Sequence, residues 1–432
     1  PVRRDVYFGS GSDKGWHTVL VAGLRYGGRG MYALDITDAS ASESSTGAKV
    51  LWEFNNTSAG GASLGYTYGR PNIGRLASGQ WVVLVPGGYF PVGSTETGAG
   101  NNFSSLFVLD AQTGALIKEI QTPTTVSGIT GAVASFGLTT PVLGDYQGDQ
   151  IDDVAFAGDL QGNLWRFDLT NTNSANWKAE LFFRSSNPGD RPVTVMPRLF
   201  ADPIGGGLVV VFGTGKYLAS SDNVIDSNTK VQRVFGIRDS GQAGQTTVVE
   251  GSTATPLVAQ TLAEKDTIRG LTTNAVPARN AVSGIIIRGW YFDLYASDGI
   301  NQTNKGERVV VDATVLSDTN RAVITTLIPQ DNDPCDPAPR GAVMFVDAAT
   351  GGAAPGVDFG SITGWPSGSM QAGALVKNPP TGGFLPVATA VGGGQIYLPG
   401  LTLEGGSQAG KTPSAGAPIW RRRSWRELNN DQ

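Results

Sequence analysis

The clearest structural signal in this sequence is Leu106-Phe107-Val108-Leu109-Asp110-Ala111-Gln112-Thr113-Gly114. An apolar, β-prone run that ends in Asp-Ala-x-Thr-Gly predicts a strand followed by a tight turn. The Asp side chain can cap the turn, and the Gly can adopt the positive φ that the turn requires. The same pattern returns at Val343-Met344-Phe345-Val346-Asp347-Ala348-Ala349-Thr350-Gly351. The chain is therefore expected to repeat one β-rich unit.

Further copies of this unit can be found by their apolar runs. Residues 31–35 and 164–168 also end in Asp, and other apolar runs lie at 18–23, 81–85, 153–158 and 208–213. Units of about four short strands are typical of propeller blades. Successive motif aspartates lie farther apart than the ~40–50 residues of a compact blade, so long loops are expected, among them residues 241–281. We predict an all-β, modified β-propeller of about seven blades with long inserted loops, forming a single domain over residues 1–432.

Composition narrows the class of protein further. The 432 residues include 60 glycines, with 16% charged and 40% hydrophobic residues, which indicates a turn-rich β protein. A net charge of −5 gives no electrostatic footprint for nucleic acid or for an anionic membrane. No apolar run approaches the ~20 residues of a membrane span, and no signal peptide is present. Because the chain starts in strand-like sequence, we expect it to be the C-terminal fragment of a longer protein.

Residues 145–153 read Asp-Tyr-Gln-Gly-Asp-Gln-Ile-Asp-Asp, with oxygen-bearing side chains at alternate positions. A hard cation such as Ca²⁺ binds six to eight oxygens at one point, and a curled loop can supply them. Three carboxylates at this spacing would repel one another without an ion. The alternative is an acidic surface turn that holds no ion. The predicted calcium ligands are Asp145, Gln147, Asp149, the backbone carbonyl of Ile151, and Asp153.

This loop differs from an EF-hand in its third and twelfth positions, which hold Gln147 and Phe156. A strand-like run follows it in place of a helix, so the loop is expected to lie between two β-strands. No catalytic site is predicted, because His17 is the only histidine and no G-x-S-x-G elbow accompanies it. Cys335 is the only cysteine, which excludes an internal disulfide. Its acidic neighbours disfavour the thiolate, so a functional thiol is not expected.

Several of these segments resemble the PilY/PilC type IV pilus biogenesis proteins. Residues 18–24 and 27–38 look like that family, and the loop followed by residues 157–168, Ala-Gly-Asp-Leu-Gln-Gly-Asn-Leu-Trp-Arg-Phe-Asp, resembles it more specifically. Residues 212–218, 325–329 and 424–428 also match. The resemblance covers nearly the whole chain and lies in the C-terminal propeller of the family.

The resemblance implies an exported, calcium-binding protein at the pilus tip, cell surface or outer membrane of a Gram-negative bacterium. It implies roles in type IV pilus assembly, in control of extension and retraction, in adhesion and in twitching motility. Minor pilins at the tip would be its partners, and host or surface ligands would bind through the missing N-terminal region. The calcium ligands of the family map onto the five residues named above. Gln147 stands where the family more often has Asp or Asn, so calcium affinity is expected to be lower.

Two alternative functions come from other classes of protein. The Asp-Ala-x-Thr-Gly turn also resembles quinoprotein dehydrogenases, propeller enzymes that hold pyrroloquinoline quinone and commonly carry an adjacent Cys pair beside it. A single cysteine cannot form that pair, so we interpret the similarity as shared blade architecture, which does not carry function. The other alternative is a secreted propeller whose calcium is purely structural.

Overall fold

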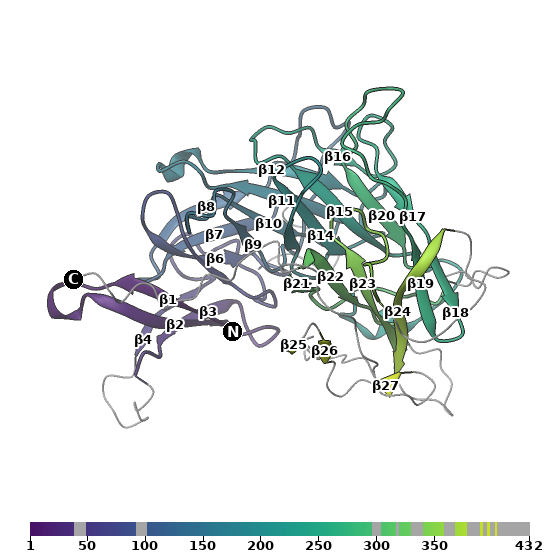
Figure 1. Ribbon diagram of the computed structural model, residues 1–432. Coiled ribbons are helices and arrows are strands. Elements are labelled where there is room, and N and C mark those ends of the chain that lie inside the picture. The colour runs from purple at the N-terminus through teal and green to yellow at the C-terminus, as the bar shows by residue number, and fades with distance from the viewer. Residues whose placement is uncertain are drawn as a thin grey trace.

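The computed structural model describes residues 1–38, 49–91, 102–295, 304–316, 319–329, 340–357 and 368–377, and the backbone of three short strands beyond them. Almost all regular structure is β (Figure 1). The helices with described bounds are 3₁₀ turns, η1 (Gly11–Asp13), η2 (Ser174–Asn176) and η3 (Ser220–Asn223). None of the described helices is long and apolar enough to cross a bilayer. Cys335 and the C-terminal residues 404–432 lie outside the described residues.

The strands form a series of sheets. The first is a meander of β1 (Val2–Phe8), β2 (Gly15–Gly23), β3 (Gly30–Asp35) and β4 (Val50–Asn55). The second has the same order, with β5 (Asn72–Arg75), β6 (Trp81–Pro86), β7 (Ser105–Asp110) and β8 (Leu116–Gln121). The third runs β16 (Val248–Val249), β12 (Lys178–Arg184), β11 (Asn163–Asp168), β10 (Val154–Gly158) and β9 (Val142–Gly144).

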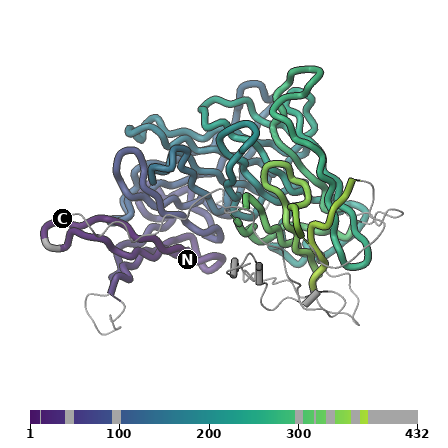
Figure 2. Tube along the Cα trace, in the orientation of Figure 1, coloured from purple at the N-terminus to yellow at the C-terminus, as the bar shows by residue number. Residues whose placement is uncertain are grey.

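The fourth and fifth sheets and one separate pair contain the remaining strands of the described residues. The fourth runs β13 (Arg198–Ala201), β14 (Leu208–Gly213), β15 (Arg233–Asp239), β20 (Gly289–Asp293) and β17 (Val258–Gln260). The fifth runs β18 (Leu262–Lys265), β19 (Ile268–Thr272), β24 (Ser369–Lys377), β23 (Arg340–Asp347), β22 (Arg321–Thr325) and β21 (Thr314–Leu316), with β27 (Thr402–Leu403) against β24. A separate pair joins β25 (Thr389–Val391) to β26 (Gln395–Tyr397). The chain passes from the first sheet, in purple, to the fifth, in green and yellow (Figure 2).

Stacking of these sheets explains why their central strands are continuously apolar. In β6, Val83 and Val85 pack toward the first sheet, whereas Val82 and Leu84 pack toward the third. Successive strand residues point to opposite faces, so a sheet buried on both faces needs apolar residues at every position. The predicted apolar runs at 31–35, 106–110, 164–168 and 343–347 are confirmed as parts of β3, β7, β11 and β23.

One expectation about the architecture is not confirmed, and another needs correction. The described residues contain five sheets of four or more strands and one two-stranded sheet, so a count of about seven blades is not confirmed. Residues 241–281, expected to be an inserted loop, instead supply strands to three sheets: β16 pairs with β12, β17 pairs with β20, and β19 pairs with β24. These pairings are non-local, and β16 and β17 are too short to show a pattern of their own.

The predicted Asp-Ala-x-Thr-Gly turn is confirmed, and it also joins the first two sheets. Asp110 Oδ1 accepts hydrogen bonds from the backbone N–H of Gln112 and Thr113, at 3.1 and 2.8 Å. Gly114 has a φ of +69°. Trp52 of β4 donates its Nε1–H to the Ala111 carbonyl oxygen at 3.0 Å. A Cβ on Gly114 would lie 2.5 Å from the indole ring, so this glycine is needed for the close approach as well as for the turn.

The same arrangement joins the fourth and fifth sheets. Asp347 caps its turn through the N–H groups of Ala349 and Thr350, and Trp290 of β20 donates to the Ala348 carbonyl oxygen at 2.9 Å. A Cβ on Gly351 would lie 2.2 Å from the Trp290 ring. In both copies the sequence repeat therefore marks a place where a tryptophan of one sheet docks on a turn of the next.

Candidate metal site

The predicted calcium loop, residues 145–153, connects β9 to β10 in the third sheet, as the sequence indicated. Its ends are held in the sheet, because Asp153 N–H donates to the Gly144 carbonyl at 2.8 Å and Leu169 N–H donates to the Asp153 carbonyl at 2.9 Å. Gly148 curls the loop with a φ of +71°. Gln150 also has a positive φ, +70°, which is uncommon for a residue with a side chain. Two left-handed residues thus turn the chain tightly back on itself.

The carboxylates of the loop close it from inside. Asp145 Oδ1 accepts the N–H of Gly148 at 2.6 Å, and its Oδ2 accepts the N–H of Gln150 at 2.8 Å. Asp149 Oδ1 accepts the N–H of Ile151 at 2.8 Å. Asp153 Oδ2 accepts the N–H of Tyr146, at 2.9 Å. Each of the three predicted carboxylate ligands therefore also shapes the loop backbone, which keeps all of them in one turn.

Oxygen atoms remain available in this turn. Within the described chain, Asp149 Oδ2, Asp153 Oδ1 and the Gln147 side chain make no hydrogen bond. Burial raises the pKa of Asp153, the N–H of Tyr146 opposes that shift, and the charges of Asp145 and Asp149 raise the pKa further. These carboxylates therefore lie close enough to repel one another, which is the electrostatic environment that a cation relieves.

The donor set fits a hard cation by type and charge, but the three carboxylates do not meet at one point. Among the residues that the structure describes, no three His, Cys, Asp or Glu side chains are grouped closely enough to hold a metal ion. Unused carboxylate and amide oxygens suit Ca²⁺ better than a softer transition metal. A bound ion would have to draw Asp149 and Asp153 inward, while the Asp145 turn keeps the loop curled.

Two residues of the loop that sequence reasoning passed over attach it to other sheets. Asp152 is buried: its backbone N–H donates to the Arg75 carbonyl at 2.7 Å, and its Oδ2 accepts the Arg75 N–H at 3.0 Å. Arg4 of β1 lies 3.4 Å from the same carboxylate oxygen. Burial raises the pKa of Asp152, and Arg4 opposes that shift. The first two sheets therefore hold one side of the loop.

On the other side, Tyr146 reaches the fourth sheet. Its hydroxyl donates to the carboxylate of Asp239, at the end of β15, and accepts from Arg166 Nη2 at 3.4 Å. Burial, followed by the negative charge of Asp239, raises the pKa of Tyr146. The residues in contact are far apart in sequence, so the only available signal was the presence of an aromatic residue inside the loop. The loop is thus a junction among several sheets.

Comparison with known proteins assigns this chain to a protein family. The family model described as the PilY1 beta-propeller domain matches residues 2–275. The chain belongs to the PilY1 β-propeller family. This confirms the resemblance to pilus biogenesis proteins and the β-propeller class.

Individual relatives agree with the family assignment. The type IV pilus biogenesis factor PilY1 of Pseudomonas aeruginosa (strain UCBPP-PA14) is 32% identical over 399 residues, which cover 82% of this chain and 31% of the relative. A PilY1 homolog of Xylella fastidiosa (strain Temecula1 / ATCC 700964) is 30% identical over 421 residues, or 96% of this chain and 30% of the relative. The crystal structure of the P. aeruginosa PilY1 C-terminal domain matches with a TM-score of 0.71 and 26% identity, covering 94% of this chain and 83% of that one. The chain spans about a third of the length of these curated relatives, which are named as biogenesis factors and not as enzymes.

Proposed function

We propose that this chain is the propeller domain of an exported type IV pilus biogenesis factor that acts at the pilus tip or cell surface. Membership of the PilY1 β-propeller family carries the proposal. Its partners would be minor pilins, and its role would extend to adhesion and twitching motility. The domain would act by binding and not by catalysis, since its relatives are named as biogenesis factors and its one cysteine cannot form the Cys pair common in quinoprotein dehydrogenases.

We further propose that the loop binds Ca²⁺ through Asp145, Gln147, Asp149, the Ile151 carbonyl and Asp153. The unused oxygens and the mutual repulsion of the carboxylates support this assignment. When bound, the ion would neutralise that repulsion and draw Asp149 and Asp153 together. Because Asp152 and Tyr146 connect the loop to other sheets, a change in loop conformation would reach surfaces of the first, second and fourth sheets. Calcium would then bias a local state and leave the stacked blade cores intact.

Chelation of calcium is expected to lower the melting temperature of the isolated domain. A ligand that binds only the folded state at a hundredfold excess over Kd contributes about 2.7 kcal/mol. Asp149→Ala and Asp153→Ala should remove this calcium sensitivity, and Mg²⁺ should restore little stability because a site with many oxygen ligands suits the larger ion. Differential scanning calorimetry with calcium, with magnesium and with EDTA provides the measurement.

Asp226→Ala is the matched control, because Asp226 is exposed and caps a similar turn through the Asn228 N–H at 2.9 Å. This variant should keep the full response to calcium. The site assignment would be wrong if Asp153→Ala and Asp226→Ala respond to EDTA in the same way as the unchanged domain.

The cellular test places Asp149→Asn together with Asp153→Asn in the full-length protein. These changes keep side-chain shape and remove two negative charges from the loop, so a folded, exported protein is expected. The number of surface pili, counted with and without blocked retraction, should change if the loop controls extension or retraction. If the variant no longer binds calcium but has wild-type numbers of pili and wild-type twitching, then the ion has only a structural role, as in the alternative of a secreted propeller.

A further inference from the structure

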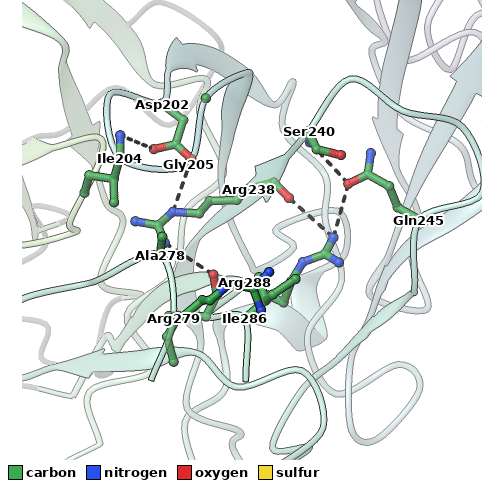
Figure 3. Close-up of a pocket in the computed structure, with 12 residues that line it drawn as sticks. Asp202, Ile204, Gly205, Arg238, Ser240, Gln245, Ala278, Arg279, Ile286 and Arg288 are labelled. Carbon is green, nitrogen blue, oxygen red and sulfur yellow. Dashed lines mark hydrogen bonds and ion pairs between the residues drawn. The ribbon is translucent and has the colours of Figure 1, made fainter. Parts of the chain in front are cut away.

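A pocket of about 360 Å³ opens beside the end of β15 in the fourth sheet. Its walls come from the turn between β13 and β14 (residues 202–206), from residues 238–245 at and after the end of β15, and from residues 278–288 before β20 (Figure 3). Three guanidinium groups line it, those of Arg238, Arg279 and Arg288, against the single carboxylate of Asp202. The pocket therefore has a net positive charge in a chain whose net charge is −5.

Arg238 is already engaged and forms the fixed floor of this pocket. It is 7% exposed, and its guanidinium donates to the carbonyl oxygens of Val276 at 2.7 Å and Pro277 at 2.8 Å. Its Nε faces Asp202 Oδ2 at 3.3 Å, outside hydrogen-bonding geometry. Figure 3 shows this guanidinium beside the Asp202 carboxylate. Asp202 thus balances Arg238, and no second carboxylate lines the pocket to pair with Arg279 or Arg288.

Arg288 is the group that lacks adequate partners. Its Nη2 makes two long contacts, 3.5 Å to the Arg238 carbonyl oxygen and 3.4 Å to Gln245 Oε1. Its Nε and Nη1 have no hydrogen-bond partner among the described residues. Burial lowers the pKa of Arg288, and Asp239 offsets this only in part. A partly desolvated guanidinium with unused donors gains most from an anion that can accept two parallel hydrogen bonds.

Arg279 adds a second positive charge at the mouth. It is exposed, and its Nη1 donates to the Gly284 carbonyl oxygen at 3.0 Å. The lining also includes two exposed apolar side chains: Ile204 is 40% exposed and Ile286 is 49% exposed. An anion held here would therefore lie next to isoleucine side chains, which favours a carboxylate attached to an apolar group over a fully hydrated inorganic ion.

We propose that this pocket binds an acidic segment of a partner protein, with a carboxylate on Arg288 and Arg279 and a neighbouring apolar side chain against Ile204 and Ile286. The planar guanidinium group of Arg288 can donate two parallel hydrogen bonds to one carboxylate. The two isoleucines offer apolar surface that an apolar side chain of the partner can cover. This goes beyond the calcium loop, which shares none of these residues.

The test measures fluorescence anisotropy of a labelled, amidated peptide, Gly-Leu-Glu-Leu-Gly, with the full chain at saturating calcium, so that the state of the loop is constant. The matched Gln peptide should bind at least about tenfold more weakly, because a hydrogen bond to a charged carboxylate contributes more to affinity than one to a neutral amide. Arg288→Leu should weaken binding of the Glu peptide by a similar factor. Arg3→Leu removes the same charge from an exposed position on β1 and should leave binding unchanged.

Arg288→Leu could weaken binding through a folding defect, so a second variant, Arg279→Gln, tests the same pocket. Arg279 is exposed, and its replacement should leave the fold unchanged. It should lower affinity severalfold without a change in melting temperature. Unlabelled Glu peptide should displace the labelled peptide, and acetate at the same concentration as the unlabelled peptide should not. If acetate displaces the labelled peptide as effectively, the pocket binds small carboxylates and the proposal is wrong. Equal affinity for the Glu and Gln peptides, or unchanged binding by both arginine variants, would also overturn it.

Discussion

Replacement of Trp290 by alanine is expected to lower the free energy of unfolding by about 3–5 kcal/mol, the usual cost of removing a large buried aromatic residue. Trp290 has no exposed surface, stacks on Phe292 with an interplanar angle of 4°, and fills the space above Gly351. Its Nε1–H also satisfies the Ala348 carbonyl oxygen. The substitution would leave a cavity between the fourth and fifth sheets, measurable as a lower urea midpoint.

Two further variants separate the contributions to this effect. Trp290→Phe keeps most of the ring and loses the N–H, so a smaller loss of about 1–3 kcal/mol is expected from the unsatisfied carbonyl. Trp16→Ala is the matched control, because Trp16 is 49% exposed on β2, and it should cost about 1 kcal/mol or less. A loss for Trp290→Ala no larger than that for Trp16→Ala would show that the docked tryptophan does not hold the sheets together.

The second large effect is expected for Asp159→Ala, at about 3 kcal/mol or more of unfolding free energy, because each buried donor left without an acceptor costs about 1–3 kcal/mol. Asp159 is fully buried in the turn between β10 and β11. Its Oδ2 accepts hydrogen bonds from Ser135 Oγ at 2.7 Å, Asn163 Nδ2 at 2.8 Å and Trp165 Nε1 at 2.8 Å. Its Oδ1 accepts the N–H groups of Gln161 and Asn163. Alanine would leave these donors buried without an acceptor.

The comparison that isolates burial is again Asp226→Ala. Asp226 accepts the Asn228 N–H in a similar turn, but it is exposed, so water replaces the lost acceptor and the cost should stay below about 1 kcal/mol. Asp159→Asn should fall between the two, because an amide keeps one acceptor oxygen and presents donors where the second oxygen was. Similar urea midpoints for Asp159→Ala and Asp226→Ala would contradict the importance of the buried carboxylate.

Local features of the fold could be predicted because their physical causes lie within a few residues. The Asp110 and Asp347 turns depend on hydrogen bonds to residues two and three positions ahead, so the pattern Asp-Ala-x-Thr-Gly is sufficient to recognise them. The strands that end at those aspartates are recognised by their continuous apolar character. The same reasoning located the loop at 145–153, whose backbone is closed by Asp145, Asp149 and Asp153 themselves.

The surroundings of the loop could not be predicted in the same way. Asp152 contacts Arg4, 148 positions earlier, and Tyr146 contacts Asp239, 93 positions later. No local pattern marks these partners, because an isolated Asp or Tyr in a loop serves equally well as a solvated surface residue. The pocket around Arg288 is a similar case, since its walls come from three separate segments of the chain.

The β class, the repeated turns, the family resemblance and the candidate calcium ligands could be inferred from the amino-acid sequence, because each depends on residue types at short, regular spacing. Three features become apparent only when the chain is folded: the number of strands in each sheet, the pairing of residues 241–281, and which tryptophan docks on which turn. Those features depend on contacts between segments that are distant in sequence. A short strand could pair with the edge of any of several sheets, and the shape and burial of the packed sheets select one of these edges. Trp52 and Gly114 show the difference: the turn is visible in Asp110–Gly114, but the ring that needs Gly114 lies in another sheet.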